Sequence, residues 1–243
     1  MEMSKKKPLV APWEVTADMF LSETETEALL IHVRRRVQME TGTARLKAIV
    51  DRLLVELLLF SGLRNSELCH LRVADTVVGH GHSALQISGT PKQDRLVYIP
   101  QVLSDEIRHF VQEIRCEFLS ADKQTADAIE TLILNERGRP YDRTALYRRV
   151  VRILTEAGLA DRASVQLLRH TYGFLAYKRT GGNLLFVQQQ LGHAHPMVTA
   201  VYAKFVEFPL ASLANQVGGE QANTIPVTSD VSPKPLRKKG AKP

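Results

Sequence analysis

The sequence predicts a mainly α-helical domain that carries one small antiparallel β-sheet. Apolar residues recur at three- and four-residue spacing through much of residues 22–205, which is the period of a buried helix face. Around residues 85–99, two short β-like runs flank a turn-prone stretch, as in a β-hairpin. Hydrophobic residues make up 44% of the 243-residue chain, which is enough to build a sizeable core.

Three helices are predicted at the start of this domain. Ser22-Glu23-Thr24-Glu25 has the form of a capping box, so a helix is expected to begin there. A second helix is expected over residues 46–61, because apolar side chains follow one face, and Gly62 is expected to end it. A short third helix is expected to begin at Asn65 or Ser66, since either residue type can cap a helix.

The hairpin and a further group of helices follow. Strands are expected at residues 85–88 and 95–99, joined by the turn-prone residues 89–94. A helix over residues 104–119 and a short strand over residues 132–134 come next. Asp142 is expected to cap a basic helix, and Pro196 suits the first turn of the last one. Beyond the basic helix, the predicted helices are 164–178, 184–191 and 196–205.

The two ends of the chain differ in composition from the middle. Residues 1–18, with the run Lys5-Lys6-Lys7 and two prolines, are predicted to form an extended basic arm. The folded domain is predicted over residues 19–217. Residues 218–243 turn to Gly, Ser, Thr, Pro and Lys without an apolar pattern, so a disordered basic tail is expected there.

Composition narrows the class of protein. Lys and Arg total 32 against 26 Asp and Glu, and the net charge of +6 favours a polyanionic partner such as nucleic acid. No apolar run approaches the roughly 20 residues of a membrane span, and the start has no signal-peptide core, so we expect a cytoplasmic protein. Cys69 and Cys116 form no metal-binding pattern, and no metal ion or cofactor is expected.

Three residues suit chemistry on an anion, although each has a plainer explanation when taken alone. Arg64 stands at the mouth of a helix, where a guanidinium can bind an anion, but most such arginines are solvated or paired with a neighbour such as Glu67. Lys92, near the hairpin tip, can donate a proton, but turn lysines are usually solvated. Arg169 interrupts an apolar helix, so it either forms an internal salt bridge or faces a site.

His193 and Tyr202 complete this set of residues. His193 follows a glycine turn, and Tyr202 lies nine positions later on the next predicted helix. Alone, the tyrosine would be core packing and the histidine a capping or surface residue. Together with two arginines and a lysine they suit phosphodiester chemistry. The arginines can clamp nonbridging oxygens, the tyrosine can attack phosphorus, and the lysine can protonate the leaving oxygen.

The order and spacing of these motifs resemble those of the tyrosine recombinases, also called the phage integrase family. The resemblance implies a tyrosine recombinase catalytic-domain fold and an active site in which Tyr202 is the nucleophile and Glu67 a support. It covers about residues 20–215, in the segments FLSETETEALL, LLLFSGLRNSELCHLRVAD, DRLVYIP, LILNERGRPY, LLRHTYGFLA and QQLGHAHPMVTAVYA. The implied catalytic residues are Arg64, Lys92, Arg169, His193 and Tyr202.

The resemblance also implies a reaction and its partners. Tyr202 would cleave one DNA strand and form a 3′-phosphotyrosyl link, which a 5′ hydroxyl from a partner duplex then attacks, without metal or cofactor. The implied partner is double-stranded DNA at recombination sites, on which a homotetramer would assemble. The protein would be cytoplasmic and would lie at the nucleoid when bound to DNA. The outcome would be integration, excision, inversion or resolution.

The sequence departs from the family pattern at three points. Gln166 stands where the family usually has His or Lys, and glutamine cannot act as an acid or base at pH 7. Lys92 is three residues before Arg95, whereas the family's lysine commonly stands about five before, where this chain has Thr90. Only about 20 residues precede the similar segment, so we expect a compact member without the N-terminal core-binding domain.

Two alternatives remain open from the sequence. Gln166 and the displaced lysine favour a catalytically weakened DNA-binding regulator of the same fold. The retained residues argue against it: Arg64, Arg169, His193 and Tyr202. A type IB topoisomerase-like enzyme would use the same chemistry and reseal the same strand.

Overall fold

The computed structural model describes residues 15–76, 83–88, 94–119 and 125–208, together with Ala214 and Val217. The chain divides into two units, Met1–Glu207 and Phe208–Pro243, and nearly all described residues belong to the first. Most of the predicted arm at residues 1–18 and the whole predicted tail at 218–243 lie outside the described residues.

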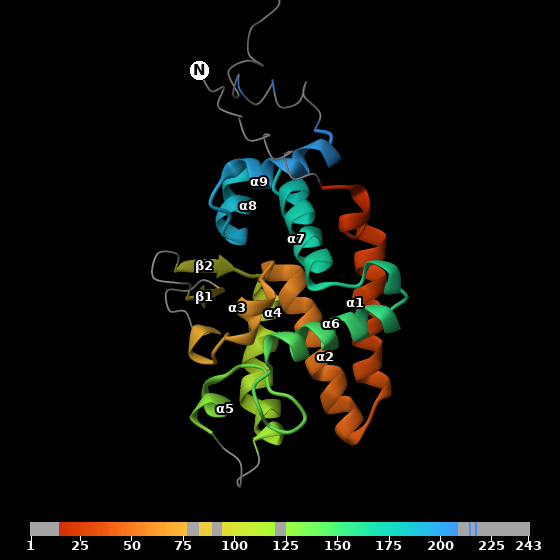
Figure 1. Cartoon of the computed structure of the whole chain (residues 1–243), viewed down its shortest axis with the longest axis vertical. Coiled ribbons are helices and arrows are strands. Elements are labelled where there is room, and N and C mark those ends of the chain that lie inside the picture. Colours follow the sequence, from red (N-terminus) through yellow and green to blue (C-terminus); the bar gives the residue numbers. More distant parts are fainter. Residues whose placement is uncertain are drawn as a thin grey trace, which may run out of the picture. The chain divides into compact units, whose positions relative to one another are not determined.

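The first unit is built mainly from helices, as predicted, with one two-stranded antiparallel sheet (Figure 1). No described helix is both long enough and apolar enough to cross a membrane. In chain order the elements are η1 (Ala17–Met19), α1 (Glu23–Met39), α2 (Gly42–Ser61), α3 (Asn65–Cys69), η2 (Ala74–Thr76), β1 (Ala84–Ile87), β2 (Arg95–Tyr98), α4 (Gln101–His109), η3 (Phe110–Ile114), η4 (Arg115–Phe118), α5 (Ala126–Glu130), α6 (Arg143–Glu156), η5 (Ala160–Arg162), α7 (Val165–Arg179), α8 (Leu184–Leu191), α9 (Pro196–Ala200) and η6 (Val201–Phe205).

Helix α2 lies at the centre of the main core. It packs along α1 and against α7 (Figure 1), and buried side chains occur all around it between residues 48 and 61. The predicted capping box opens α1: the Glu25 backbone N–H donates to Ser22 Oγ at 3.2 Å, and the Ser22 N–H donates to Glu25 Oε2 at 2.8 Å. Gly62 ends α2 at φ +63°, as predicted. Local capping therefore fixes where both helices begin or end.

The hairpin strands pair as predicted, with a register that sets which side chains point inward. Ala84 pairs with Tyr98 and Ile87 pairs with Arg95. Along β2, Val97 is fully buried and Arg95 is half-buried, whereas Leu96 and Tyr98 are exposed. Because side chains alternate between the two faces of a strand, Arg95 shares the inward face with Val97.

Two predicted details are wrong. Helix α3 is capped by Arg64 and begins at Asn65, so neither Asn65 nor Ser66 is its cap; the Glu67 carboxylate turns back to accept the Arg64 backbone N–H at 2.7 Å. Residues 132–134 are buried but form no strand, because isolated bridges join Thr131 to Arg72 and Leu134 to Pro140. The N–H of Leu132 donates to the Leu71 carbonyl and that of Asn135 donates to the Arg139 carbonyl, so the two ends of the segment pair with different parts of the chain and no ladder forms.

Two other predicted helices change geometry part-way. The segment predicted over residues 104–119 begins at Gln101, and after His109 it passes through η3 and η4, where Arg115 turns inward and donates to the carbonyl oxygens of residues 128–132. The last predicted helix is α-helical to Ala200 and then continues as the 3₁₀ helix η6. Neither change alters the face that each segment buries.

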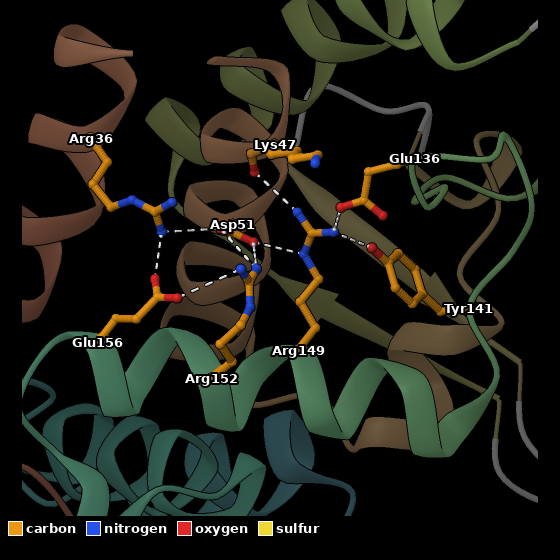
Figure 2. A network of polar contacts seen from close by, with 8 residues as sticks. All are labelled: Arg36, Lys47, Asp51, Glu136, Tyr141, Arg149, Arg152 and Glu156. Atoms are coloured by element: carbon orange, nitrogen blue, oxygen red, sulfur yellow. Dashed lines mark hydrogen bonds and ion pairs between the residues drawn. The ribbon is translucent and has the colours of Figure 1, made fainter. Parts of the chain in front are cut away.

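A buried carboxylate ties three of the helices together (Figure 2). Asp51, in α2, is 1% exposed and accepts from Arg149 Nε of α6 at 2.7 Å and from Arg36 Nη1 of α1 at 3.2 Å. Arg152 approaches the same carboxylate at 3.4 Å. Arg149 is itself 8% exposed and also donates to Tyr141 Oη and the Glu136 carboxylate. The three arginines thus neutralise a charge that burial alone would make costly.

We expect Asp51→Asn to lower the free energy of unfolding by about 3 to 5 kcal/mol, because the buried Arg149 would lose its buried counter-charge and keep only Glu136, whose side chain is 41% exposed. Urea unfolding followed by circular dichroism measures the change. The matched control is Asp105→Asn, which removes the exposed Arg108–Asp105 pair and should cost less than about 1 kcal/mol. Equal losses in the two variants would contradict the assignment.

Candidate active site

The two arginines singled out in the sequence converge on the turn that ends α8. Arg169, in α7, donates from Nη2 to the carbonyl oxygen of Leu191 at 2.6 Å. Arg64, just before α3, donates from Nη2 to the carbonyl oxygen of Gly192 at 2.9 Å. Two side chains from separate parts of the sequence therefore hold the same turn, which leads directly into His193.

Two glycine turns present the backbone carbonyls of this site. Gly62 ends α2 and Gly192 ends α8, both with φ close to +60°, a conformation that glycine adopts without strain. Arg169 Nη1 donates to the Gly62 carbonyl, so one guanidinium joins the ends of both helices. A Cβ on Gly62 would also collide with the Tyr172 ring. A guanidinium placed there suits the partial negative charge of two helix C-termini.

Glu67, predicted as a supporting residue, lies between two arginines. Its Oε1 accepts from Arg64 Nη1 at 2.8 Å and from Arg95 Nη1 at 2.7 Å. Its Oε2 accepts from the Arg64 backbone N–H and from Arg95 Nη2 at 3.0 Å. Burial would raise the pKa of Glu67, but these hydrogen bonds and the charges of Arg95 and Arg64 lower it to about 2. The carboxylate is therefore ionised throughout the neutral range.

Arg95 is a residue of this cluster that the sequence reasoning used only as a landmark of the hairpin. Its side chain is 15% exposed, against 40% for that of Arg64. Its Nε donates to the carbonyl oxygen of Gln190 at 3.2 Å. The position of Arg95 in its strand could have indicated this role. Arg95 alternates with Leu96 and therefore lies on the same buried face as Val97, and an arginine on a buried face needs an internal partner.

The site is positively charged. Arg64, Arg95 and Arg169 surround the single carboxylate of Glu67, and burial together with the charge of Arg64 lowers the pKa of Arg169 to about 10. Arg169 therefore stays protonated at neutral pH. Such a cluster attracts an anion of two or more charged oxygens. Within the described residues, no group of three or more His, Cys, Asp or Glu side chains is placed to hold a metal ion.

Tyr202 lies in a second, smaller core and is 1% exposed. Its phenol oxygen is 3.0 Å from His170 Nδ1, and burial raises the pKa of Tyr202 to about 12, although the charge of Arg169 opposes the rise. Its ring lies against Gly173, where an added Cβ would collide with it. The phenol is therefore neutral in this arrangement, and an attacking phenolate requires removal of its proton.

His170 is a second residue that the sequence reasoning did not place in the site. It follows Arg169 in α7 and contacts the Tyr202 hydroxyl. Burial, and then the charge of Arg169, lowers the pKa of His170 to about 4, so its imidazole is neutral at pH 7. The pairing arises between two segments that lie 32 positions apart, and no local motif in the sequence marks it.

His193 is held from both sides of its turn. Its Nδ1 lies 2.9 Å from the hydroxyl of the fully buried Thr199, and its backbone N–H donates to the Gln188 carbonyl at 3.1 Å. Burial lowers the pKa of His193 to about 4, and the charges of Arg169 and Arg64 add to the effect. His193 is therefore neutral at pH 7 and next to the turn that both arginines hold.

Of the other two predicted site residues, Gln166 does not join this cluster. Lys92 lies outside the described residues. Gln166 is exposed on the first turn of α7, where it lines a surface hollow with Ser164 and His170. Arg64 and Glu67 line a different hollow. The structure thus assembles Arg64, Glu67, Arg169 and His193 directly, with Tyr202 beside His170.

Comparison with known proteins decides the family. The sequence profile described as "Phage integrase family" matches residues 20–207, which is most of the chain. The chain belongs to the phage integrase family. The fold predicted from the sequence, a mainly helical tyrosine recombinase catalytic domain with a small antiparallel sheet, is confirmed.

Curated relatives of this family member are tyrosine recombinases. Tyrosine recombinase XerC of Halalkalibacterium halodurans is 31% identical over 183 residues, which covers 75% of this chain and 56% of the relative. Tyrosine recombinase XerH of Helicobacter pylori is 26% identical over 156 residues, covering 64% of this chain and 41% of the relative. The chain spans about half the length of the curated relatives it matches.

Solved structures share the fold. A XerH site-specific recombinase bound to a palindromic difH substrate, in a post-cleavage complex, superposes with a TM-score of 0.64 and 23% identity, covering 84% of this chain and 54% of that one. The XerA recombinase gives a TM-score of 0.60 and 23% identity, covering 85% and 65%. At this identity the likeness establishes the architecture of the family member.

We expect the stability of this integrase-family domain to fall as pH drops from about 7 to 4. His170 and His193 have a pKa of about 4 when folded and an ordinary value of 6.5, so unfolding takes up protons in this window. Each contributes roughly 2 kcal/mol of lost stability by pH 5. Urea unfolding between pH 7.5 and 4.5 measures the slope.

Glutamine variants test the two histidines, because glutamine keeps a hydrogen-bonding side chain without a proton to gain. His170→Gln and His193→Gln should each flatten the pH dependence, and the double variant should flatten it most. Replacement of the exposed His195 by glutamine is the matched control. A double variant with the native slope would show that other groups carry the effect.

Proposed function

We propose that this protein is a site-specific DNA recombinase in which Tyr202 attacks a backbone phosphate and forms a 3′-phosphotyrosyl intermediate. The observation that carries the proposal is that Arg64 and Arg169 both bind the turn that leads into His193. Tyr202 lies close enough to Arg169 for that positive charge to oppose the rise in the tyrosine's pKa. These are the residue types that strand transfer through tyrosine requires. Names of the curated relatives support the same activity.

Arg64 and Arg169 are suited to bind the scissile phosphate. In the transition state negative charge builds on the nonbridging oxygens, and preorganised guanidiniums stabilise that charge more than they stabilise the ground state. Arg64 remains 40% exposed, so a phosphate can reach it, while Arg169 is enclosed and held by backbone carbonyls. His193, neutral and adjacent to the same turn, adds a hydrogen-bond donor.

The nucleophile needs a proton acceptor. Gln166, at the position where the family usually has histidine or lysine, cannot accept a proton at neutral pH. His170 Nδ1, at 3.0 Å from the phenol oxygen, is neutral and within transfer distance. In this proposal the Tyr202 proton moves to His170 as the O–P bond forms, so that no free phenolate precedes the attack, and the 5′ oxygen leaves with a proton from Lys92.

We propose double-stranded DNA recombination sites as the substrate and four protomers around two duplexes as the active assembly. The net charge of +6 favours a nucleic-acid partner. The relative XerH has been solved on a difH substrate. Rejoining requires the 5′ hydroxyl of a partner duplex, so at least two duplexes must lie side by side. We place the protein in the cytoplasm, at the nucleoid when bound to DNA.

We expect the native protein to form a covalent adduct with a nicked suicide substrate, because loss of the short 5′ fragment prevents resealing. Tyr202→Phe should form none. The matched control is Tyr147→Phe, an exposed tyrosine on α6, which should react like the native protein. Denaturing gel electrophoresis of labelled DNA measures the adduct, and Arg64→Gln and Arg169→Gln should each slow it by about a hundredfold or more.

The same experiment separates the alternatives. Sequence-specific binding without adduct would identify a DNA-binding regulator and would sink the recombinase proposal. Relaxation of supercoiled DNA without strand exchange between two sites would identify a topoisomerase-like activity. An adduct that persists in Tyr202→Phe would show that Tyr202 is not the nucleophile.

We expect Lys92→Ala to slow cleavage strongly when the leaving atom is oxygen and weakly when it is sulfur. A thiolate leaves without a proton, so a substrate with sulfur at the bridging 5′ position bypasses a general acid. Single-turnover cleavage rates on the two substrates measure the difference. The control is Gln93→Ala, the next residue in the sequence, and equal slowing of Lys92→Ala on both substrates would reject lysine as the acid.

A further inference from the structure

Arg95 connects the hairpin to the site, and it is not among the residues proposed to react with DNA. Its Nη1 and Nη2 bind the two oxygens of Glu67 at 2.7 and 3.0 Å, and its Nε donates to the carbonyl of Gln190 at 3.2 Å. It also lies against Gly192, where an added Cβ would stand 2.9 Å from Arg95 Cζ. One side chain therefore contacts both α3 and the end of α8.

Arg95 shares the Glu67 carboxylate with Arg64. Each oxygen of Glu67 receives one hydrogen bond from Arg95 and one from Arg64. Without Arg95 the carboxylate would keep only its bonds to Arg64 and would be free to rotate toward it. Such a closer pairing would neutralise Arg64, which is the guanidinium that remains exposed to substrate.

We propose that Arg95 is a positioning residue for strand cleavage: it fixes the Glu67 carboxylate, which holds Arg64, and Arg64 in turn holds the Gly192 turn before His193. The inference rests on the proposed recombinase function. Arg95 is the enclosed member of the pair, at 15% exposure, so it holds the geometry while Arg64 meets the substrate. Its planar fork is needed, because a lysine ammonium cannot make two parallel hydrogen bonds to one carboxylate in this way.

The competing explanation is that Arg95 only stabilises the fold by fastening the hairpin. In that case its removal would lower the melting temperature, and the folded protein would cleave DNA at the native rate. Action through Glu67 predicts instead that the loss in rate depends on Glu67. Side chains that act as one unit give non-additive effects when both are replaced.

The experiment measures single-turnover cleavage of the nicked suicide substrate at saturating protein, with DNA affinity and melting temperature for every variant. Arg95→Gln and Arg95→Lys should both slow cleavage by about tenfold to a hundredfold, because small displacements of a substrate-binding group cost this much. DNA affinity should change far less. In a Glu67→Gln background, Arg95→Gln should lower the rate by no more than about twofold further. The control is Arg108→Gln, which removes an exposed ion pair.

Each outcome decides one question. A native protein that binds DNA but forms no adduct overturns the proposed function and this inference with it. An active native protein with a fully active Arg95→Gln variant overturns the inference alone. Full slowing by Arg95→Gln in the Glu67→Gln background would show that Arg95 does not act through Glu67. Native rates in Arg95→Lys would show that charge suffices and that the two-pronged contact is unnecessary.

Discussion

The geometry of the site depends on one buried guanidinium. Arg169 is 5% exposed and donates to the carbonyl oxygens of Gly62 and Leu191, so its guanidinium joins the C-terminal ends of α2 and α8. An unpaired charge at this depth would cost on the order of several kcal/mol, so these carbonyls must stay in place. Arg64 follows Gly62 by two residues, and His193 follows Leu191 by two. Both are therefore placed by the turns that Arg169 fixes.

Two carboxylates that each bind several arginines have different roles in this molecule. Asp51 is 1% exposed and binds Arg36, Arg149 and Arg152, a network that joins α1, α2 and α6 and shares no residue with the site. Glu67 binds Arg64, whose side chain stays 40% exposed. Asp51 and Arg149 are both buried, so their pair is a structural tie between helices, although Arg152 at its edge is 50% exposed. Partial burial leaves the second group next to a cation that an incoming anion can still reach.

The sequence was sufficient for the features that depend on local signals. The Ser22–Glu25 capping box and the turn at Gly62 depend on neighbours in the chain, and the family motifs identified Arg64, Arg169, His193 and Tyr202 one by one. Contacts made across the fold had no such signal: the partner of His170 is 32 positions away, and that of Arg95 is 28. The prediction of a strand over residues 132–134 is wrong because the two ends of the segment pair with different parts of the chain, which its apolar character does not show.

The small core around Tyr202 also contains residues from the beginning of the described chain. Val15 is fully buried there, and the Phe20 ring stacks on Phe174 at 4.4 Å between centroids while its edge meets Phe205 at 5.0 Å. Phe205 lies on the same turn of η6 as Tyr202. A truncation that removes residues up to 20 would thus remove the Phe20 ring from the small core that contains Tyr202. Protein engineering at residues 15–20 therefore changes the surroundings of Tyr202, the proposed nucleophile.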